Sequence, residues 1–404
     1  MYRILSLDGG GSWALLQLLT LKYHYGNISG HEVLKHFDLV VANSGGSIVL
    51  AALCENWNLE KALGLFDQKE KRELIFSKNS FKERFFPIDY IRLFGGKFGP
   101  KYSSKRKKEA FDSLFKQCSK RQMHELHDFI GKGCPKLVVC TYDALNNRAK
   151  FFRSFSNKNV FDSITLTQAI HGSSNAPIQY FDFPARFKAS NTEVFYELWD
   201  GALGGFNNPI VVGIIEALKM GISKKDIYIV SIGTGNKIMS KEEKSDFWNT
   251  KLETQKNRSK KWKLNKLEVQ FKFFSKSILQ QAKTILYQPP DWANYVAYMF
   301  LFGEQDVFDP KRIIRLSPMI HTDKNDVDPS ESYKKLIRRL YAMDMDLTND
   351  SDIETLKMCF DYWSSDKMKN QPIEFRVTRE NELVYIRGSK HFSEAIGFWK
   401  NLDN

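Results

Sequence analysis

Residues 37–53 have the sequence FDLVVANSGGSIVLAAL: a short apolar run, a cluster of small residues and a second apolar run. The first run, 37–41, predicts a buried strand, and the second predicts a helix. The chain must bend sharply between them, at Ser44, and because the neighbours of Ser44 are small its hydroxyl is left accessible at the bend. Ala42 stands where a G-x-S-x-G turn has its first glycine. From this stretch alone, an ordinary strand-to-helix turn is as good an interpretation as a nucleophile.

Three further apolar runs end, like 37–41, at glycine, small or polar residues: Tyr2–Leu7, Lys136–Cys140 and Asp226–Ile232. Helical periodicity separates them, for example over 210–218. Short buried strands that alternate with helices predict an α/β fold with a central, mostly parallel sheet covered by helices. Active sites of such folds lie beyond the carboxyl ends of the strands, so we expect the turns after the four runs to meet at one edge.

The turn after the first run is Asp8-Gly9-Gly10-Gly11. Three successive glycines let the backbone fold tightly and direct several N–H groups inward, which makes a site for an anion. The functional interpretation is an oxyanion hole, to which the helix after Ser44 adds the N–H of Gly45. An ordinary glycine turn or a phosphate loop is the alternative. A phosphate loop is disfavoured because neither Gly-Lys-Ser/Thr nor a complete G-x-G-x-x-G follows.

A serine nucleophile needs a base, and histidine is the usual one. Among the eight histidines, His171 is the best placed, and we interpret it as structural. His124 and His127 have no metal-ligand companions and are interpreted as solvated helix residues. Asp200 precedes a glycine and an Asn-Asn-Pro turn, a pattern that on its own indicates only a loop. The residues by themselves therefore nominate Ser44 and leave the base open.

Taken in order along the chain, these segments resemble motifs of the patatin-like phospholipase family. The matching segments are Asp8–Gly11, Phe37–Ser44, Ala169–Pro177, Asp200–Ala202 with Asn207–Pro209, Ser231–Gly235 and Met343–Leu356. The resemblance implies a three-layer α/β/α sandwich and a dyad in which Ser44 is the nucleophile and Asp200 the general base. It also implies an oxyanion hole, formed by Gly9, Gly10, Gly11 and Gly45. No metal or other cofactor is expected.

The activity that the resemblance implies is phospholipase A-type hydrolysis of the carboxyl esters of phospholipids through an acyl-enzyme. Three positions depart from the family pattern: Ala42 and Ser47 replace glycines, and Trp13-Ala14 stands where Arg-Gly or Lys-Gly is common. The last departure removes a cationic contributor to the oxyanion hole. The alternative is a catalytically weak or inactive protein of the same fold that binds membranes or a partner.

The net charge of +13 is concentrated in two segments, 69–108 and 237–276. Such charge attracts phosphate, and because no nucleic-acid-binding module accompanies it we expect a membrane surface as the partner and no nucleic-acid polymer. One helical face in the second segment is apolar and edged with lysines, which suits membrane docking; a core helix with a solvated flank is the alternative. Its apolar residues are Leu267, Phe271, Phe274 and Ile278. The first segment, without clean periodicity, is expected to be a lid or a mobile loop.

Three regions are expected: a catalytic core over 1–235 with the basic insertion 69–108, a basic amphipathic insertion over 236–290, and a helical part over 291–404 that completes or caps the domain. A late pair of strands is expected in the last region, at 373–377 and 383–386. No apolar run is long enough to span a membrane, and the first strand leaves no room for a signal peptide. Five scattered cysteines predict reduced thiols, so we expect a cytoplasmic protein peripheral at membranes. The resemblance also implies that a protein or a small nucleotide can serve as activator.

Overall fold

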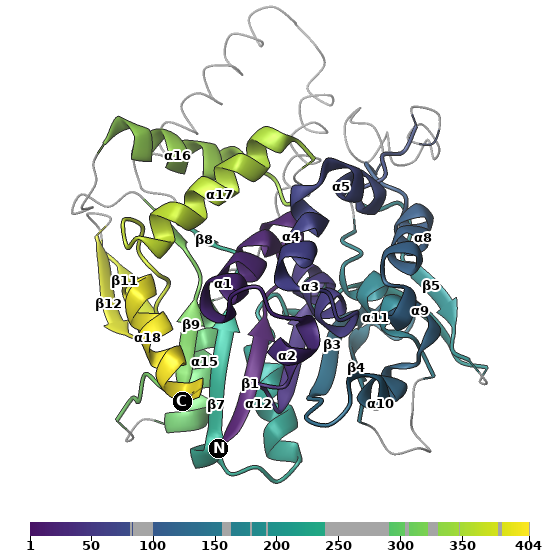
Figure 1. Cartoon of the computed structure of the whole chain (residues 1–404), viewed down its shortest axis with the longest axis horizontal. Helices are drawn as coiled ribbons and strands as arrows, with labels where there is room; N and C mark the ends of the chain where they lie inside the picture. Colours follow the sequence, from purple (N-terminus) through teal and green to yellow (C-terminus); the bar gives the residue numbers. More distant parts are fainter. Residues whose placement is uncertain are drawn as a thin grey trace, which may run out of the picture.

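The computed structural model describes residues 1–403 with gaps at 81–82, 84–99, 156–162, 178–179, 191–192, 239–290, 304–306, 322–329, 347 and 379–381. Its centre is a sheet in the order β5-β6-β3-β2-β1-β7-β9, with β4 beside β3 (Figure 1). The strands are β1 Tyr2–Leu7, β2 Leu39–Asn43, β3 Lys136–Asp143, β4 Arg148–Arg153, β5 Ala185–Lys188, β6 Phe195–Asp200, β7 Ile227–Ile232 and β9 Ile313–Leu316. The β1, β2, β3, β7 and β9 strands are parallel to one another. The β4 and β6 strands are antiparallel to β3, and β5 is antiparallel to β6. The predicted α/β fold with a mostly parallel sheet is confirmed.

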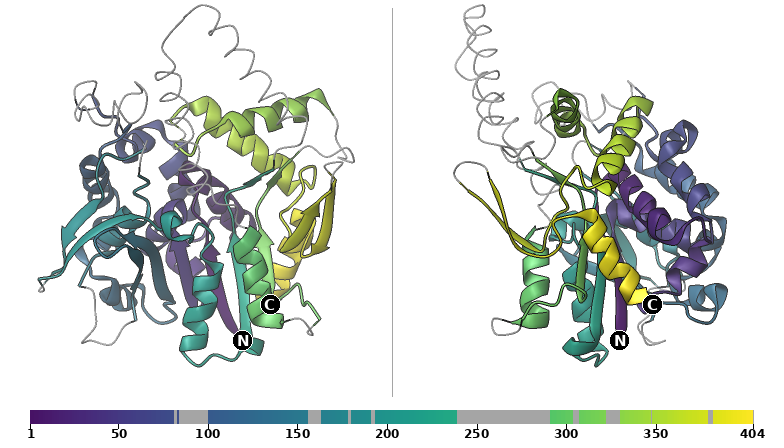
Figure 2. Two further views of the ribbon diagram at one scale, coloured as in Figure 1. Left: turned by 180° about the vertical axis from the view of Figure 1, so that it is seen from behind. Right: turned by 60° about the vertical axis from the view of Figure 1, so that its left-hand side comes forward.

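Helices cover both faces of this sheet, because side chains along the buried strands alternate between two apolar clusters. Leu5 and Val40 pack into the cluster that contains α1, α3 and α11, whereas Ile4 and Val41 pack into the cluster with α12 and α15. Figure 2 shows the two helical layers on opposite sides of the sheet. The helices are α1 Leu15–Tyr25, α2 Gly30–Leu34, α3 Ser44–Cys54, α4 Leu59–Asp67, α5 Lys69–Ile75, α8 Ser104–Leu114, α9 Lys116–Lys120, α10 Leu126–Ile130, α11 Leu166–Ser173, α12 Ile210–Lys219, α15 Asp291–Phe302, α16 Glu331–Ala342, α17 Asp350–Ser364 and α18 Phe392–Asp403.

The region after 290 does more than add helices, because it supplies β9 to the edge of the central sheet beside β7. It also contains β10 (Met319–Ile320), which pairs with β8 (Asn236–Lys237). The predicted late strand pair is present as β11 (Glu374–Val377) and β12 (Leu383–Arg387). The β9 strand escapes prediction from sequence because it is only four residues long and contains a charged residue, Arg315, which is nevertheless buried.

The basic segment 69–108 is helical at both ends, so its interpretation as a mobile loop is wrong there. Its first residues form α5 and its last begin α8, and the two helices pack against each other. Phe76 and Tyr102, between them, are buried. Residues 84–99 lie outside the described residues. So does the amphipathic face predicted within 239–290.

Within the described part of the chain, no helix combines the length and the apolar character that crossing a membrane requires. The five cysteines are free thiols, as predicted.

Candidate active site

Two strand ends meet along one edge of β3. The β2 strand runs parallel to β3 and ends with Asn43 opposite Cys140, whereas β6 runs antiparallel and ends with Asp200 opposite Thr141. The β4 strand pairs with β3 over both of these stretches and so occupies its other edge. The β2 and β6 strands therefore approach each other end to end, which brings the residue after Asn43 against Asp200.

Ser44 is the residue at this junction, and its backbone is strained. Its φ of 48° lies in the left-handed region, which costs a non-glycine residue on the order of 1–3 kcal/mol. Its N–H donates a hydrogen bond of 2.9 Å to Oγ of Ser173, which holds the turn in place. Ser44 also begins α3, directly after β2. The strand–turn–helix predicted around Ser44 is confirmed.

The hydroxyl of Ser44 donates a hydrogen bond of 2.6 Å to Oδ2 of Asp200. The other carboxylate oxygen, Oδ1, accepts bonds from the backbone N–H of Ala202 at 2.9 Å and from Nδ2 of Asn43 at 3.3 Å. Burial raises the pKa of Asp200 above its usual value, against the opposing effects of these hydrogen bonds and of Lys107. The structure thus brings together the two residues predicted as a dyad, and an aspartate with a raised pKa is better matched to accepting a proton near neutral pH.

The glycine loop after β1 lies against this junction. A methyl group built on Gly45 would stand 2.4 Å from the carbonyl oxygen of Gly11, so only glycine allows the loop and α3 to approach this closely. No acceptor within the described residues takes the amides of Gly10, Gly11 or Gly45. Three of the four predicted oxyanion donors therefore have amides that no other described residue takes, and Gly11 and Gly45 also line the cavity at Ser44.

Gly9 does not fit the role predicted for it. Its N–H already donates a hydrogen bond of 2.7 Å to the carbonyl oxygen of Asn207. A methyl group on Gly9 would stand 3.0 Å from Cβ of Ser44 and 2.5 Å from Oδ1 of Asn207. Gly9 therefore allows close packing around Ser44, and the expectation that it donates to an oxyanion is corrected.

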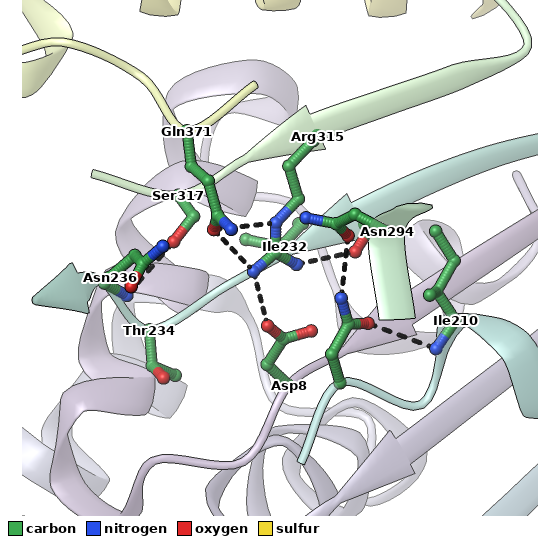
Figure 3. Close-up of polar contacts among 12 residues, drawn as sticks. Asp8, Ile210, Ile232, Thr234, Asn236, Asn294, Arg315, Ser317 and Gln371 are labelled. Atoms are coloured by element: carbon green, nitrogen blue, oxygen red, sulfur yellow. Dashed lines mark hydrogen bonds and ion pairs between the residues drawn. The ribbon is translucent and has the colours of Figure 1, made fainter. Parts of the chain in front are cut away.

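A buried ion pair fixes the start of the glycine loop. Figure 3 shows Asp8 facing Arg315, which approaches from β9 with Gln371 beside its guanidinium. Nη2 of Arg315 lies 2.6 Å from Oδ2 of Asp8, and Nη1 donates a bond of 2.7 Å to Oγ of Ser231. The same Nη2 donates to Oε1 of Gln371 at 3.0 Å. Because Arg315 and Gln371 lie after residue 290, the C-terminal region holds the loop that packs on Ser44.

The C-terminal region also holds the loop from its other side, through Trp13. The indole N–H of Trp13 donates a hydrogen bond of 2.9 Å to the carbonyl oxygen of Asp344, and the N–H of Ser12 donates one of 2.9 Å to that of Met345. Trp13 is buried, so the residue that stands in place of a common Arg or Lys anchors the loop.

A small cavity of about 20 Å³ opens at Ser44, with room for about one water molecule. Its lining is largely apolar and includes one lysine, Lys107, which the sequence does not single out because it lies in the basic run SKRKK. The lining residues are Gly11, Ser44, Gly45, Ile48, Phe76, Lys107, Ser174, Ala176, Tyr180, Phe181, Met345 and Asp346.

The histidines do not take part in this site. Nε2 of His171 lies 3.0 Å from Oγ of Ser104, and burial lowers the pKa of His171 well below its usual value. It is a buried, structural residue, as predicted. Across the described ranges, no group of three or more His, Cys, Asp or Glu side chains is placed to hold a metal ion.

Comparison with known proteins relates the chain to one family. A family model described as patatin-like phospholipase matches residues 5–214, which contain Ser44 and Asp200. No curated protein matches the chain. Among solved structures, VipD from Legionella pneumophila matches with 11% identity over 88% of this chain and 67% of that one. Its TM-score of 0.36 is too low to support any conclusion about this chain.

Proposed function

The chain belongs to the patatin-like phospholipase family, and on this premise we propose that it is a lipid acyl hydrolase with Ser44 as nucleophile and Asp200 as general base. The observation that carries the proposal is the 2.6 Å hydrogen bond from the Ser44 hydroxyl to the Asp200 carboxylate, at a strained turn beside available amides. A hydroxyl in this position can lose its proton as it attacks, which is what makes serine a nucleophile.

In the proposed reaction, Asp200 takes the proton of Ser44 while Oγ attacks the carbonyl carbon of a phospholipid ester. The negative charge that develops on the carbonyl oxygen is received by the amides of Gly10, Gly11 and Gly45. Such preorganised donors are each worth on the order of 10²–10³ in turnover. The tetrahedral intermediate collapses to an acyl-enzyme and releases the lysolipid. Water activated by Asp200 then frees the fatty acid.

The small size of the cavity supports a need for activation. A space that holds about one water molecule does not admit a fatty acyl chain until side chains in its wall move. Met345 and Phe181 line the wall, and both belong to segments that pack over Ser44. We propose that contact with a membrane surface, a protein partner or a small nucleotide opens the cavity. The basic segments 69–108 and 237–276 are the proposed membrane contacts.

A second candidate function, favoured by the same small cavity, is a catalytically weak or inactive protein that binds membranes or a partner. The two candidates separate in one experiment: release of fatty acid from mixed phospholipid vesicles, with and without candidate activators. We expect release by the wild type, and its loss in Ser44→Ala and in Asp200→Asn. Equal release by the wild type and Ser44→Ala would contradict the proposal.

The matched control is Ser6→Ala. Ser6 is another buried serine, on the neighbouring strand β1, and its hydroxyl has no hydrogen-bond partner among the described residues. Removing this hydroxyl is expected to leave both stability and fatty-acid release unchanged. Any loss common to Ser6→Ala and Ser44→Ala would therefore reflect folding and not chemistry.

A further inference from the structure

Lys107 is a buried lysine in the wall of the cavity that contains Ser44. It lies on α8 and is only 1% exposed. Its ammonium lies 3.8 Å from the ring centroid of Phe181 and donates a hydrogen bond to the carbonyl oxygen of Ser174. Within the described residues, no acceptor takes its other two N–H groups. A buried ammonium with unused donors is costly unless a negative charge balances it.

Three consecutive residues at the end of α11 hold Lys107 together with the proposed dyad. Oγ of Ser173 accepts the N–H of Ser44 at 2.9 Å, and the carbonyl oxygen of Ser174 accepts the ammonium of Lys107. The next carbonyl, of Asn175, accepts the N–H of Asp200 at 3.2 Å. One short segment therefore sets the positions of nucleophile, base and cation relative to one another.

Asp200 is a carboxylate that interacts electrostatically with Lys107. Burial lowers the pKa of Lys107 well below its usual value, and the carboxylate of Asp200 acts in the opposite direction. Asp346 is the carboxylate among the described residues that line the cavity, and it is already engaged by the ammonium of Lys101 at 2.8 Å and by the hydroxyl of Tyr102.

The charge at this site moves during the reaction but does not change in amount. As the Oγ–carbon bond forms, the proton of Ser44 passes to Asp200 and the carbonyl π electrons move to oxygen, so one negative charge shifts from the carboxylate to the oxyanion. When the intermediate collapses, the bond to the leaving alcohol breaks and Asp200 returns the proton to it. A fixed cation that shares the cavity with Ser44 and interacts electrostatically with Asp200 stabilises the charge in both positions.

We propose that Lys107 is a catalytic residue, whose ammonium contacts the oxyanion formed at Ser44 together with the amides of Gly11 and Gly45. It supplies from α8 the positive charge that Trp13 does not provide in the glycine loop. This inference rests on the proposed function of Ser44, because it assigns a further group to the same reaction.

The test measures how fast a neutral alkyl fluorophosphonate labels Ser44, followed by mass spectrometry. Oγ of Ser44 attacks phosphorus and fluoride leaves, and the pentacoordinate centre formed on the way carries a negative charge on the phosphoryl oxygen. Labelling is measured with and without the candidate activators, because entry to the small cavity can depend on them. Lys107→Met keeps the length of the side chain and removes its charge, and we expect labelling to slow on the order of 10²-fold. Lys150→Met is the matched control, because Lys150 also lies over aromatic rings, 5.3 Å from those of Phe152 and Tyr196, but outside the cavity.

Two further variants separate charge from packing. Lys107→Gln keeps a donor for the carbonyl of Ser174 without the charge, and we expect its Ser44 to be labelled slowly as well. This variant replaces Lys107→Met in the test if Lys107→Met does not fold. In Lys107→Ala, added propylammonium is expected to restore labelling by about tenfold, whereas propanol is not.

The inference would be overturned if folded Lys107→Met or Lys107→Gln were labelled at a rate within about threefold of the wild-type rate. It would also be overturned if propanol restored labelling of Lys107→Ala as well as propylammonium does. If wild-type Ser44 is not labelled either with or without the candidate activators while the protein is folded, the proposed function fails instead. The two failures are therefore distinguishable.

Discussion

Gly45→Ala tests whether the glycine loop must touch α3 for the site to work. The added methyl group would stand 2.4 Å from the carbonyl oxygen of Gly11 and 2.9 Å from the nitrogen of Gly11. The distance to the oxygen is roughly 1 Å shorter than an ordinary van der Waals contact. Both atoms belong to the backbone, so the loop must move away from Ser44. Overpacking of this kind costs about 1–3 kcal/mol, and the better helix propensity of alanine offsets up to about 1 kcal/mol of it.

The loss of activity is expected to be much larger than this loss of stability. Displacing the loop removes the Gly11 amide from the oxyanion position, which costs on the order of 10²–10³ in turnover. Hydrolysis of a short-chain p-nitrophenyl ester measures turnover, and urea unfolding measures the free energy of unfolding.

Gly397→Ala is the matched control for this variant. Gly397 is also helical, in α18, and a methyl group there meets nothing within 4 Å. We expect this substitution to stabilise the protein by about 0.5–1 kcal/mol and to leave turnover unchanged. Turnover by Gly45→Ala at the wild-type level would refute the assignment of the glycine loop to the oxyanion hole.

The remaining predictions concern the buried charges around the site. Arg315→Met and Asp8→Asn each leave one charge buried without its partner, so each should lower the free energy of unfolding by about 3–5 kcal/mol. The double variant should lower it by less than the sum of the two single losses. Additive losses in urea unfolding would argue against the pairing of Asp8 with Arg315. Because burial raises the pKa of Asp200, the folded state loses stability as the pH rises from the unfolded pKa of about 3.9 through the higher folded pKa. Asp200→Asn should therefore unfold at higher urea than the wild type at pH 7, with a gain that shrinks toward pH 4; a wild type that is the more stable at pH 7 would count against this. His171→Gln should leave the pH dependence of turnover unchanged, because His171 contacts Ser104 and not Ser44; a shifted profile would reveal a histidine base.

The parts of the site that the sequence predicts are those encoded locally. The strand, bend and helix around Ser44 follow one another along the chain, so the pattern of apolar and small residues is sufficient to place them. Asp200 is different, because its position depends on β2 and β6 meeting end to end on β3. No local pattern encodes that meeting, and only the resemblance to a family predicts it.

Other features of the site depend on contacts between distant segments. Gly9 has the same local signature as Gly10 and Gly11, but the carbonyl of Asn207 takes its N–H. Arg315 lies in a short strand, and its burial follows from the ion pair with Asp8. Lys107 is one of several cations in a run that resembles a solvated helix face. Its burial depends on the packing of α8 against α11.

The most direct test of the account is to find the acyl-enzyme itself. The wild type is incubated with phospholipid vesicles, quenched in acid and digested, and the peptides are examined by mass spectrometry. We expect a fatty acyl ester on the peptide that carries Ser44, absent from Ser44→Ala. An acyl group on another residue, or fatty acid released equally without Ser44, would contradict this expectation.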